Sequence, residues 1–126
     1  MDNNYDFIFL NFANGDMVGH TGNYDMTKKA IETIDEMIGK LYKKCVEDEY
    51  LFIITADHGN AEEELDADGN PFTAHTTNPV PFVLVNYDED YTLREGGCLA
   101  DIVPTMIEMM GMEQPAEMTG TSLLVK

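Results

Sequence analysis

Three short segments of the chain are apolar almost without interruption: residues 5–12, 50–55 and 80–85. Continuous apolar runs of this length are typical of strands that are buried on both faces, as in a parallel sheet covered by helices. Polar, Gly- and Asn-rich stretches follow the first two runs and are expected to be loops. The sequence therefore predicts three buried strands.

Two helices are predicted between and after these strands. From Asp25 to about Glu49, apolar residues recur at spacings of three and four and form one stripe, with Asp25 as the expected N-cap. Residues 99–110 form the second helix, which ends at Gly111. The alternation of strands and helices predicts an α/β fold with a mainly parallel sheet flanked by helices. With 126 residues, of which 44% are hydrophobic, the chain fits a single domain.

The composition is strongly acidic, and this limits the partners of the chain. Its formal net charge is −17, from 24 acidic and 7 basic residues, which repels nucleic acid and anionic membranes and favours cations or a basic partner. Acidic runs such as Glu62-Glu63-Glu64 are expected to face water. Cys45 and Cys98 lack the spacing of a zinc site or a disulfide framework. We expect a cytoplasmic protein, since neither a membrane-spanning segment nor a signal peptide is predicted.

The three histidines occur in polar segments that also carry aspartates, and none is expected on a helix. Asp16 and His20 follow the first predicted strand. Asp57 and His58 follow the second, and His75 lies in the loop before the third. These side chains are expected to converge at the carboxyl edge of the sheet, although each taken alone also fits an ordinary surface position. Imidazole and carboxylate are ligands of zinc, manganese and iron, and five such groups indicate two metal ions rather than one.

Another acidic stretch, DADGN at residues 66–70, resembles the start of a calcium-binding loop. Such a loop requires glycine at its sixth position and glutamate at its twelfth, where this sequence has Pro71 and Thr77. We therefore expect a turn at this point and no calcium site.

Four motifs together resemble one known family: NFANGDMVGHTG, TADHGNAE, TAHTTNPVPF and the closing LADIVPTMIEMMG with PAEMTGTSL. They resemble the C-terminal part of cofactor-independent phosphoglycerate mutase, which belongs to the alkaline phosphatase superfamily. The similarity runs from about Tyr5 to Leu124, and the first motif separates this family from phosphopentomutase. The resemblance implies an alkaline-phosphatase-like α/β fold, of which residues 1–126 are only the C-terminal part of a metal-binding phosphatase-type domain.

The resemblance also implies an activity, the glycolytic interconversion of 3-phosphoglycerate and 2-phosphoglycerate through a phosphoserine intermediate. Two divalent metal ions are implied, with Mn²⁺ as the expected metal. By the family's pattern, Asp16, His20 and His75 hold the first ion, while Asp57 and His58 hold the second. One cation would orient the phosphoryl group, and the other would lower the pKa of the serine hydroxyl.

Other residues of that family's active site find no counterpart in this sequence. The nucleophilic serine and one further aspartate ligand lie upstream of the matching region in the family. The only serine here, Ser122, lies outside the metal motifs, and Arg94 is the only arginine, although guanidinium groups grip the substrate in the family. We therefore expect the chain to bind metal without turnover. The full-length enzyme is expected to be a monomer, whereas a missing half of the sheet would leave an apolar edge that favours self-association of this chain.

Two other functions also fit the sequence. A non-catalytic metal-binding module, acting alone or on a partner, fits the missing serine and would be favoured by a gene that encodes only this segment. Another enzyme of the same superfamily, such as phosphopentomutase or a phosphodiesterase, fits the Asp-His-Gly stretch. The motif at residues 11–22 weighs against this last alternative.

Overall fold

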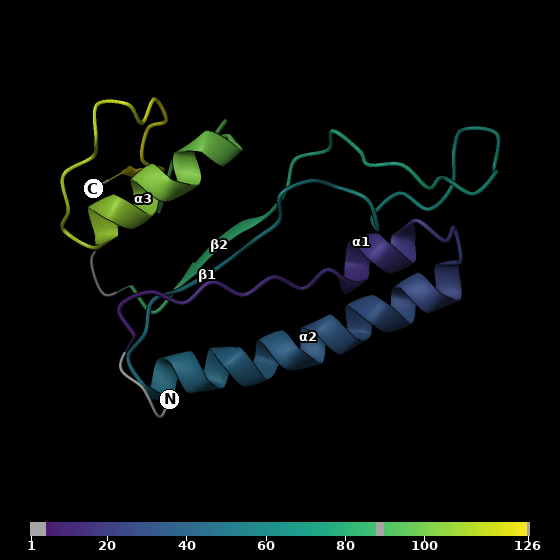
Figure 1. The fold of residues 1–126 in the computed structure, drawn as a ribbon, viewed down its shortest axis with the longest axis horizontal. Coiled ribbons are helices and arrows are strands. Elements are labelled where there is room, and N and C mark those ends of the chain that lie inside the picture. The colour runs from purple at the N-terminus through teal and green to yellow at the C-terminus, as the bar shows by residue number, and fades with distance from the viewer. Residues whose placement is uncertain (1–4, 88–89, 126) are drawn as a thin grey trace. The chain divides into compact units, whose positions relative to one another are not determined.

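The computed structural model describes residues 5–87 and 90–125. The chain divides into two compact units, Met1–Tyr87 and Asp88–Lys126, each with its own strand pair and helix (Figure 1). No helix in the described ranges is long and apolar enough to cross a membrane.

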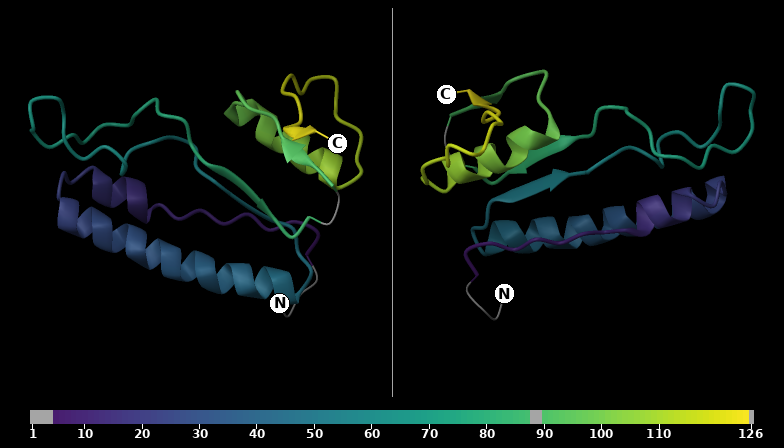
Figure 2. Two further views of the ribbon diagram at one scale, coloured as in Figure 1. Left: turned by 180° about the vertical axis from the view of Figure 1, so that it is seen from behind. Right: turned by 45° about the horizontal axis from the view of Figure 1, so that its top comes forward.

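The first unit contains two helices and a pair of strands. They are α1 (Asn14–Gly19), α2 (Tyr24–Glu47), β1 (Phe52–Thr55) and β2 (Phe82–Val85). Helix α1 lies beside the N-terminal half of α2 in every view (Figures 1 and 2). A Cβ added to Gly15 would lie 3.3 Å from Cδ1 of Ile31, so α1 packs closely on the apolar stripe of α2.

Helix α2 forms where the apolar spacing predicts it, but its cap differs from the prediction. The N-cap is Asn23, whose Oδ1 accepts a hydrogen bond from the backbone N–H of Met26 at 3.1 Å. The prediction of Asp25 as the cap is therefore wrong. Asp25 lies in the first turn instead, where a negative charge is favoured by the helix dipole. Near the other end, Lys44 pairs with Asp48 at 2.8 Å.

Strands β1 and β2 lie within the apolar runs that predict them, but they pair in the antiparallel direction, with Phe52 opposite Val85. The expectation of parallel pairing is thus wrong for these strands. An apolar run predicts a strand from its composition alone. It carries no information on which strand lies beside it or in which direction the two strands pair, because these depend on residues distant in the sequence.

Residues 5–12 are not a strand, contrary to the expectation from their apolar character. They run extended past α2 (Figure 2), and no strand in the described ranges pairs with them. Phe7 is 55% exposed and Phe9 is 79% exposed. A strand requires hydrogen bonds from a neighbouring strand, so a composition typical of a strand does not by itself make this segment one.

The second unit is a short strand pair with one helix. It contains β3 (Thr92–Leu93), the 3₁₀ helix η1 (Leu99–Asp101), α3 (Ile102–Met109) and β4 (Leu124–Val125), and β3 pairs antiparallel with β4. The predicted helix over 99–110 is confirmed, although its first turn is a 3₁₀ helix. Gly111 follows with a φ of 67°, the left-handed conformation in which glycine ends helices.

A buried acid, Asp101, connects three segments of the second unit. Its carboxylate accepts hydrogen bonds from the backbone N–H of Thr121 at 2.8 Å and of Cys98 at 2.9 Å, and from the Arg94 side chain at 2.6 Å. The backbone donors of Thr121 and Cys98, followed by Arg94, hold the pKa of Asp101 well below its usual range. Arg94 is therefore engaged in an internal ion pair.

The acidic stretch at 66–70 is a turn, as the sequence predicts. Asp66 Oδ1 accepts hydrogen bonds from the backbone N–H of Asp68 at 2.9 Å and of Asn70 at 2.8 Å. Gly69 has a φ of 81°, which the turn requires and which glycine adopts at little cost.

Candidate metal centre

Four of the five predicted ligands meet around one carboxylate oxygen, Oδ1 of Asp16. His75 Nε2 lies 3.0 Å from it, His20 Nε2 lies 3.1 Å from it, and His58 Nε2 lies 3.9 Å from it. The ligand atoms of Asp16, His58 and His75 all fall within 4.8 Å of one another. Three segments of the first unit thus place imidazole nitrogens around one carboxylate, which is a donor set suited to a divalent transition metal.

Helix α1 supplies two members of this group. Asp16 lies on the helix, and His20 directly follows its last residue, Gly19. A separation of four residues places both side chains on one face, which explains their close approach. The expectation of a loop at this point is wrong, and the helical spacing of Asp16 and His20 is the signal that could have corrected it.

Position 19 must be glycine because Asn60, in the segment that follows β1, lies directly against it. A Cβ at Gly19 would overlap the side-chain amide of Asn60, which is itself only 6% exposed. Asn60 Nδ2 donates a hydrogen bond to Asp16 Oδ1 at 2.9 Å. The close approach of α1 to the segment after β1 therefore fixes the orientation of the Asp16 carboxylate.

The electrostatic surroundings of Asp16 favour its charged form. Burial raises the pKa of its carboxyl, but the hydrogen bond from Asn60 and the nearby imidazoles of His20, His75 and His58 outweigh this effect. The pKa consequently lies below its usual value. A charged carboxylate among three imidazoles is suited to receive a cation.

The other ring nitrogens of two histidines lie near backbone carbonyls. His20 Nδ1 is 2.6 Å from the carbonyl oxygen of Thr73, and His58 Nδ1 is 3.3 Å from that of Gly59. A carbonyl only accepts hydrogen bonds, so we assign the ring proton to Nδ1 in both residues. Nε2 is then left with a lone pair on the side that faces Asp16. Histidines that bind metals in proteins are usually held in this way, so these residues fit a metal ion.

The fifth predicted ligand, Asp57, lies at the margin of the group. Its Oδ1 is 3.7 Å from His58 Nε2, and its side chain is 88% exposed. His58 itself stacks on His75, with ring centroids 3.7 Å apart. The predicted division into one set with Asp16, His20 and His75 and another with Asp57 and His58 is therefore not visible as two separate clusters.

Two residues around these ligands were not identified from the sequence: Asn60 and Glu62. Glu62 is exposed, as expected, but its carboxylate also accepts hydrogen bonds from Asn60 and Thr76. The hydrogen bond from Thr76 is the main cause that lowers the pKa of Glu62 to about 2. The sequence gives no signal for these hydrogen bonds, because Glu62 stands in a run of three glutamates that cannot be distinguished from one another by residue type.

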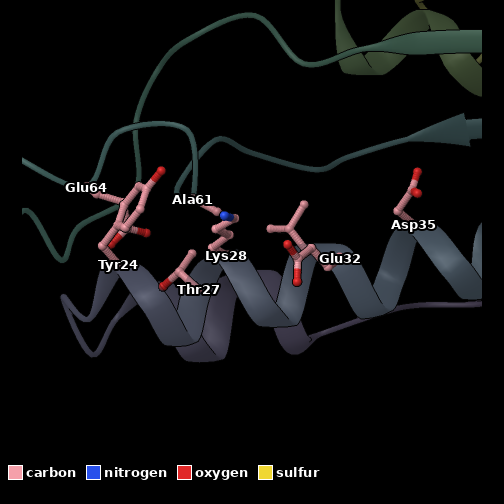
Figure 3. Close-up of a pocket in the computed structure, with 8 residues that line it drawn as sticks. Tyr24, Thr27, Lys28, Glu32, Asp35, Ala61 and Glu64 are labelled. Carbon is pink, nitrogen blue, oxygen red and sulfur yellow. The ribbon is translucent and has the colours of Figure 1, made fainter.

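A pocket of about 420 Å³ lies between α2 and the segment that follows Asn60 (Figure 3). Its lining consists of Tyr24, Thr27, Lys28, Ile31, Glu32, Asp35, Ala61 and Glu64. Both carboxylate oxygens of Glu64 and the hydroxyl of Thr27 are buried without a hydrogen-bond partner. None of the five predicted metal ligands lines this pocket, so it is distinct from the cluster around Asp16.

Comparison with known proteins agrees with a metal site. The profile of the metalloenzyme superfamily matches residues 1–114. The chain belongs to this superfamily. The carboxylate and imidazole cluster lies within the matched residues, and its donor set is suited to a divalent metal.

Two curated relatives of the chain carry the same name. The 2,3-bisphosphoglycerate-independent phosphoglycerate mutase of Lachnoclostridium phytofermentans is 63% identical over 123 residues, which are 97% of this chain and 24% of that protein. The protein of the same name from Gloeobacter violaceus is 55% identical over 95% of this chain and 24% of its own length. The chain thus spans about a quarter of the length of the curated relatives that it matches.

A solved structure has the same fold. It is a crystal structure of Leishmania mexicana phosphoglycerate mutase at low cobalt concentration, with a TM-score of 0.79 and 34% identity. The alignment covers 90% of this chain and 24% of that one. The α/β fold implied by the sequence resemblance is therefore confirmed, although the strand pairs in the described ranges are antiparallel.

Proposed function

We propose that the chain provides the metal-binding part of the active site of a 2,3-bisphosphoglycerate-independent phosphoglycerate mutase. The reaction is the interconversion of 3-phosphoglycerate and 2-phosphoglycerate. The observation that carries this proposal is the convergence of His20, His58 and His75 on Asp16, in a chain 63% identical to a relative of that name. The name of these relatives also argues against the alternative that the chain is part of a phosphopentomutase.

Asp16, His20 and His75 would hold one metal ion, and His58 with Asp57 would contribute to a second. Manganese is the proposed metal. When bound, the cations would supply positive charge that orients a phosphoryl group and lowers the pKa of an attacking hydroxyl. The chain's own residues hold the ligands in place: Asn60 orients the Asp16 carboxylate, and the carbonyl of Thr73 fixes the proton of His20.

Two threonine hydroxyls next to predicted ligands, those of Thr21 and Thr76, are engaged in local hydrogen bonds. Thr21 Oγ1 donates to the carbonyl of Val18 at 2.6 Å, and Thr76 Oγ1 donates to Glu62. Ser122 Oγ accepts from the backbone N–H of Leu124 at 3.2 Å, far from any metal motif in the sequence. We therefore propose that residues 1–126 bind metal without catalysing the mutase reaction by themselves, and that the nucleophile and the substrate-binding arginines belong to another part of the enzyme.

Calorimetric titration of the metal-free chain with Mn²⁺ tests this function. Binding should be lost in His75→Ala and in Asp16→Asn, because both remove a group at the centre of the cluster. Asp68→Asn, which removes an exposed carboxylate of the 66–70 turn, should bind as the wild type does. Wild-type chain that takes up no manganese would contradict the proposal, and mutase turnover by the chain alone would show that its nucleophile has been overlooked.

A further inference from the structure

We propose that Glu62 is a positioning residue of the metal centre, which holds the segment that bears His75 against the segment that bears His58. This inference rests on the proposed function, because the two segments bear residues that are proposed to bind the metal. Glu62 makes no hydrogen bond to any of the five predicted ligands among the contacts in the described ranges. It acts through the residues next to them.

The carboxylate of Glu62 bridges two stretches of chain. One oxygen, Oε2, accepts a hydrogen bond from the backbone N–H of Asn60 at 2.7 Å. The other, Oε1, accepts from the hydroxyl of Thr76 and from Nδ2 of Asn78 at 3.1 Å. One side chain thus receives donors from the segment after β1 and from the segment before β2.

The backbones of the same two stretches are also joined. Thr76 N–H donates to the carbonyl of Gly59 at 2.8 Å, and the pair forms an isolated antiparallel bridge. A Cβ at Gly59 would overlap both Thr76 Oγ1 and Glu62 Oε1, so the approach leaves room only for glycine. His58 precedes one bridge residue and His75 precedes the other, which places the two imidazoles in contact.

The connection extends to a third ligand through Asn60. Its backbone N–H is held by Glu62, while its side chain donates to Asp16 Oδ1 at 2.9 Å. A shift of Asn60 would therefore also release the carboxylate of Asp16. Through this chain of hydrogen bonds, Glu62 influences all three ligands that share the compact cluster.

A charged carboxylate is required for this role. The side chains and backbone groups that contact the Glu62 carboxylate through Asn60, Thr76 and Asn78 are hydrogen-bond donors, and its pKa of about 2 keeps both oxygens available as acceptors at neutral pH. Glutamine offers one acceptor oxygen, and its amide N–H groups would face donors. Glu63 differs, since its carboxylate makes a weak contact with the same segment, with Oε2 at 3.4 Å from Asn78 Nδ2.

The test compares Glu62→Gln with Glu63→Gln in the whole chain, because both variants remove one negative charge from adjacent positions. Mn²⁺ affinity is measured by calorimetry, and the visible spectrum of bound Co²⁺ reports the coordination geometry. We expect Glu62→Gln to weaken Mn²⁺ binding by about tenfold and to change the Co²⁺ spectrum, since loss of such outer contacts typically costs about 10- to 100-fold in affinity. Glu63→Gln should stay within about twofold of the wild type.

Amide hydrogen exchange provides a readout that needs no metal. The Thr76 amide should exchange faster in Glu62→Gln, whereas the amides of Phe52–Thr55 in β1 should keep their protection. If Glu62→Gln fails to fold, Thr76→Val and Thr76→Ser replace it. The valine should reproduce the loss of affinity, and the serine, which keeps the hydroxyl donor, should restore it.

The outcomes separate this inference from the proposed function. Unchanged affinity, spectrum and exchange in the Glu62 and Thr76 variants would overturn the positioning role while leaving the metal site intact. Wild-type chain that binds no Mn²⁺ would contradict the proposed function. In that case the exchange rate of the Thr76 amide still decides whether Glu62 holds the two segments together.

Discussion

The imidazole rings of His58 and His75 are stacked, with centroids 3.7 Å apart and planes inclined by 17°. One ring follows β1 and the other precedes β2, so their contact depends on the bridge between Gly59 and Thr76. The metal centre therefore relies on a close approach of backbone segments as well as on the ligands themselves.

Gly59→Ala should destabilise the first unit. The added methyl group would overlap Thr76 and Glu62, and overpacking of this kind costs about 1–3 kcal/mol. Gly39→Ala in α2 is a matched control, because a Cβ there meets no atom within 4 Å. In a helix interior this control should stabilise the chain by about 0.5–1 kcal/mol. Urea unfolding measures both changes, and equal effects of the same sign would contradict the close approach at Gly59.

Asn60→Ala should weaken metal binding without removing a ligand. The substitution deletes the donor that orients Asp16, and we expect a loss of about tenfold in Mn²⁺ affinity. Asn70→Ala, in the exposed turn at 66–70, is the control, because it also removes a side-chain amide. Calorimetry on the two variants distinguishes them, and an Asn60 variant with wild-type affinity would show that Asp16 needs no such support.

The stability of the chain should fall in acid partly through Glu62. Its pKa drops from 4.5 to about 2 on folding, chiefly through the hydrogen bond from Thr76. The contribution is complete above about pH 4.5 and is lost as the pH falls toward about 2. Because the side chain is exposed, we expect no more than about 1 kcal/mol. Unfolding free energies of wild type and Glu62→Gln should differ at neutral pH and converge in strong acid; a constant difference would refute this origin.

Asp101→Asn should loosen the second unit. The substitution removes the charge that receives Arg94 and the backbone donors of Cys98 and Thr121. Hydrogen exchange at the Thr121 amide should accelerate by about tenfold or more, because a hydrogen bond to a charged acceptor is replaced. Glu95→Gln, an exposed neighbour of Arg94, should leave this rate unchanged. Equal rates in both variants would exclude Asp101 as the residue that joins these segments.

Self-association should depend on residues 5–10. All six side chains are exposed, including Phe7 and Phe9, and an exposed apolar segment that belongs to no strand in the described ranges favours pairing between copies. The double variant Phe7→Ser/Phe9→Ser should shift sedimentation toward the monomer. Leu65→Ser, which removes an exposed apolar side chain elsewhere, should not. A wild-type chain that remains monomeric at high concentration would contradict this prediction.

The parts of the structure that could be predicted are those set by local pattern. Helix α2 is predicted by its apolar stripe. The end of the second helix is predicted by Gly111, because glycine readily adopts the left-handed conformation that it has there. The direction of the β1–β2 pair, and the fact that residues 5–12 belong to no strand in the described ranges, depend on distant segments, and local pattern gives no information on them. Parallel pairing and a strand at 5–12 were therefore predicted wrongly.

The same distinction applies to the site. Asp16, His20, His58 and His75 could be proposed as ligands because carboxylate and imidazole carry recognisable chemistry, and the structure brings them together. Asn60 and Glu62 could not, since amide and acidic side chains are common on surfaces. Their importance arises from contacts with segments that only the fold brings close, such as the bridge at Gly59 and Thr76.

The uncovered segment at residues 5–10 also bears on the lifetime of this chain in a cell. Extended apolar segments on a surface are what molecular chaperones and proteases act on when they sort folded from unfolded proteins. Phe9, at 79% exposed, would mark the chain for such sorting. Its abundance would then be set by how soon the segment is covered.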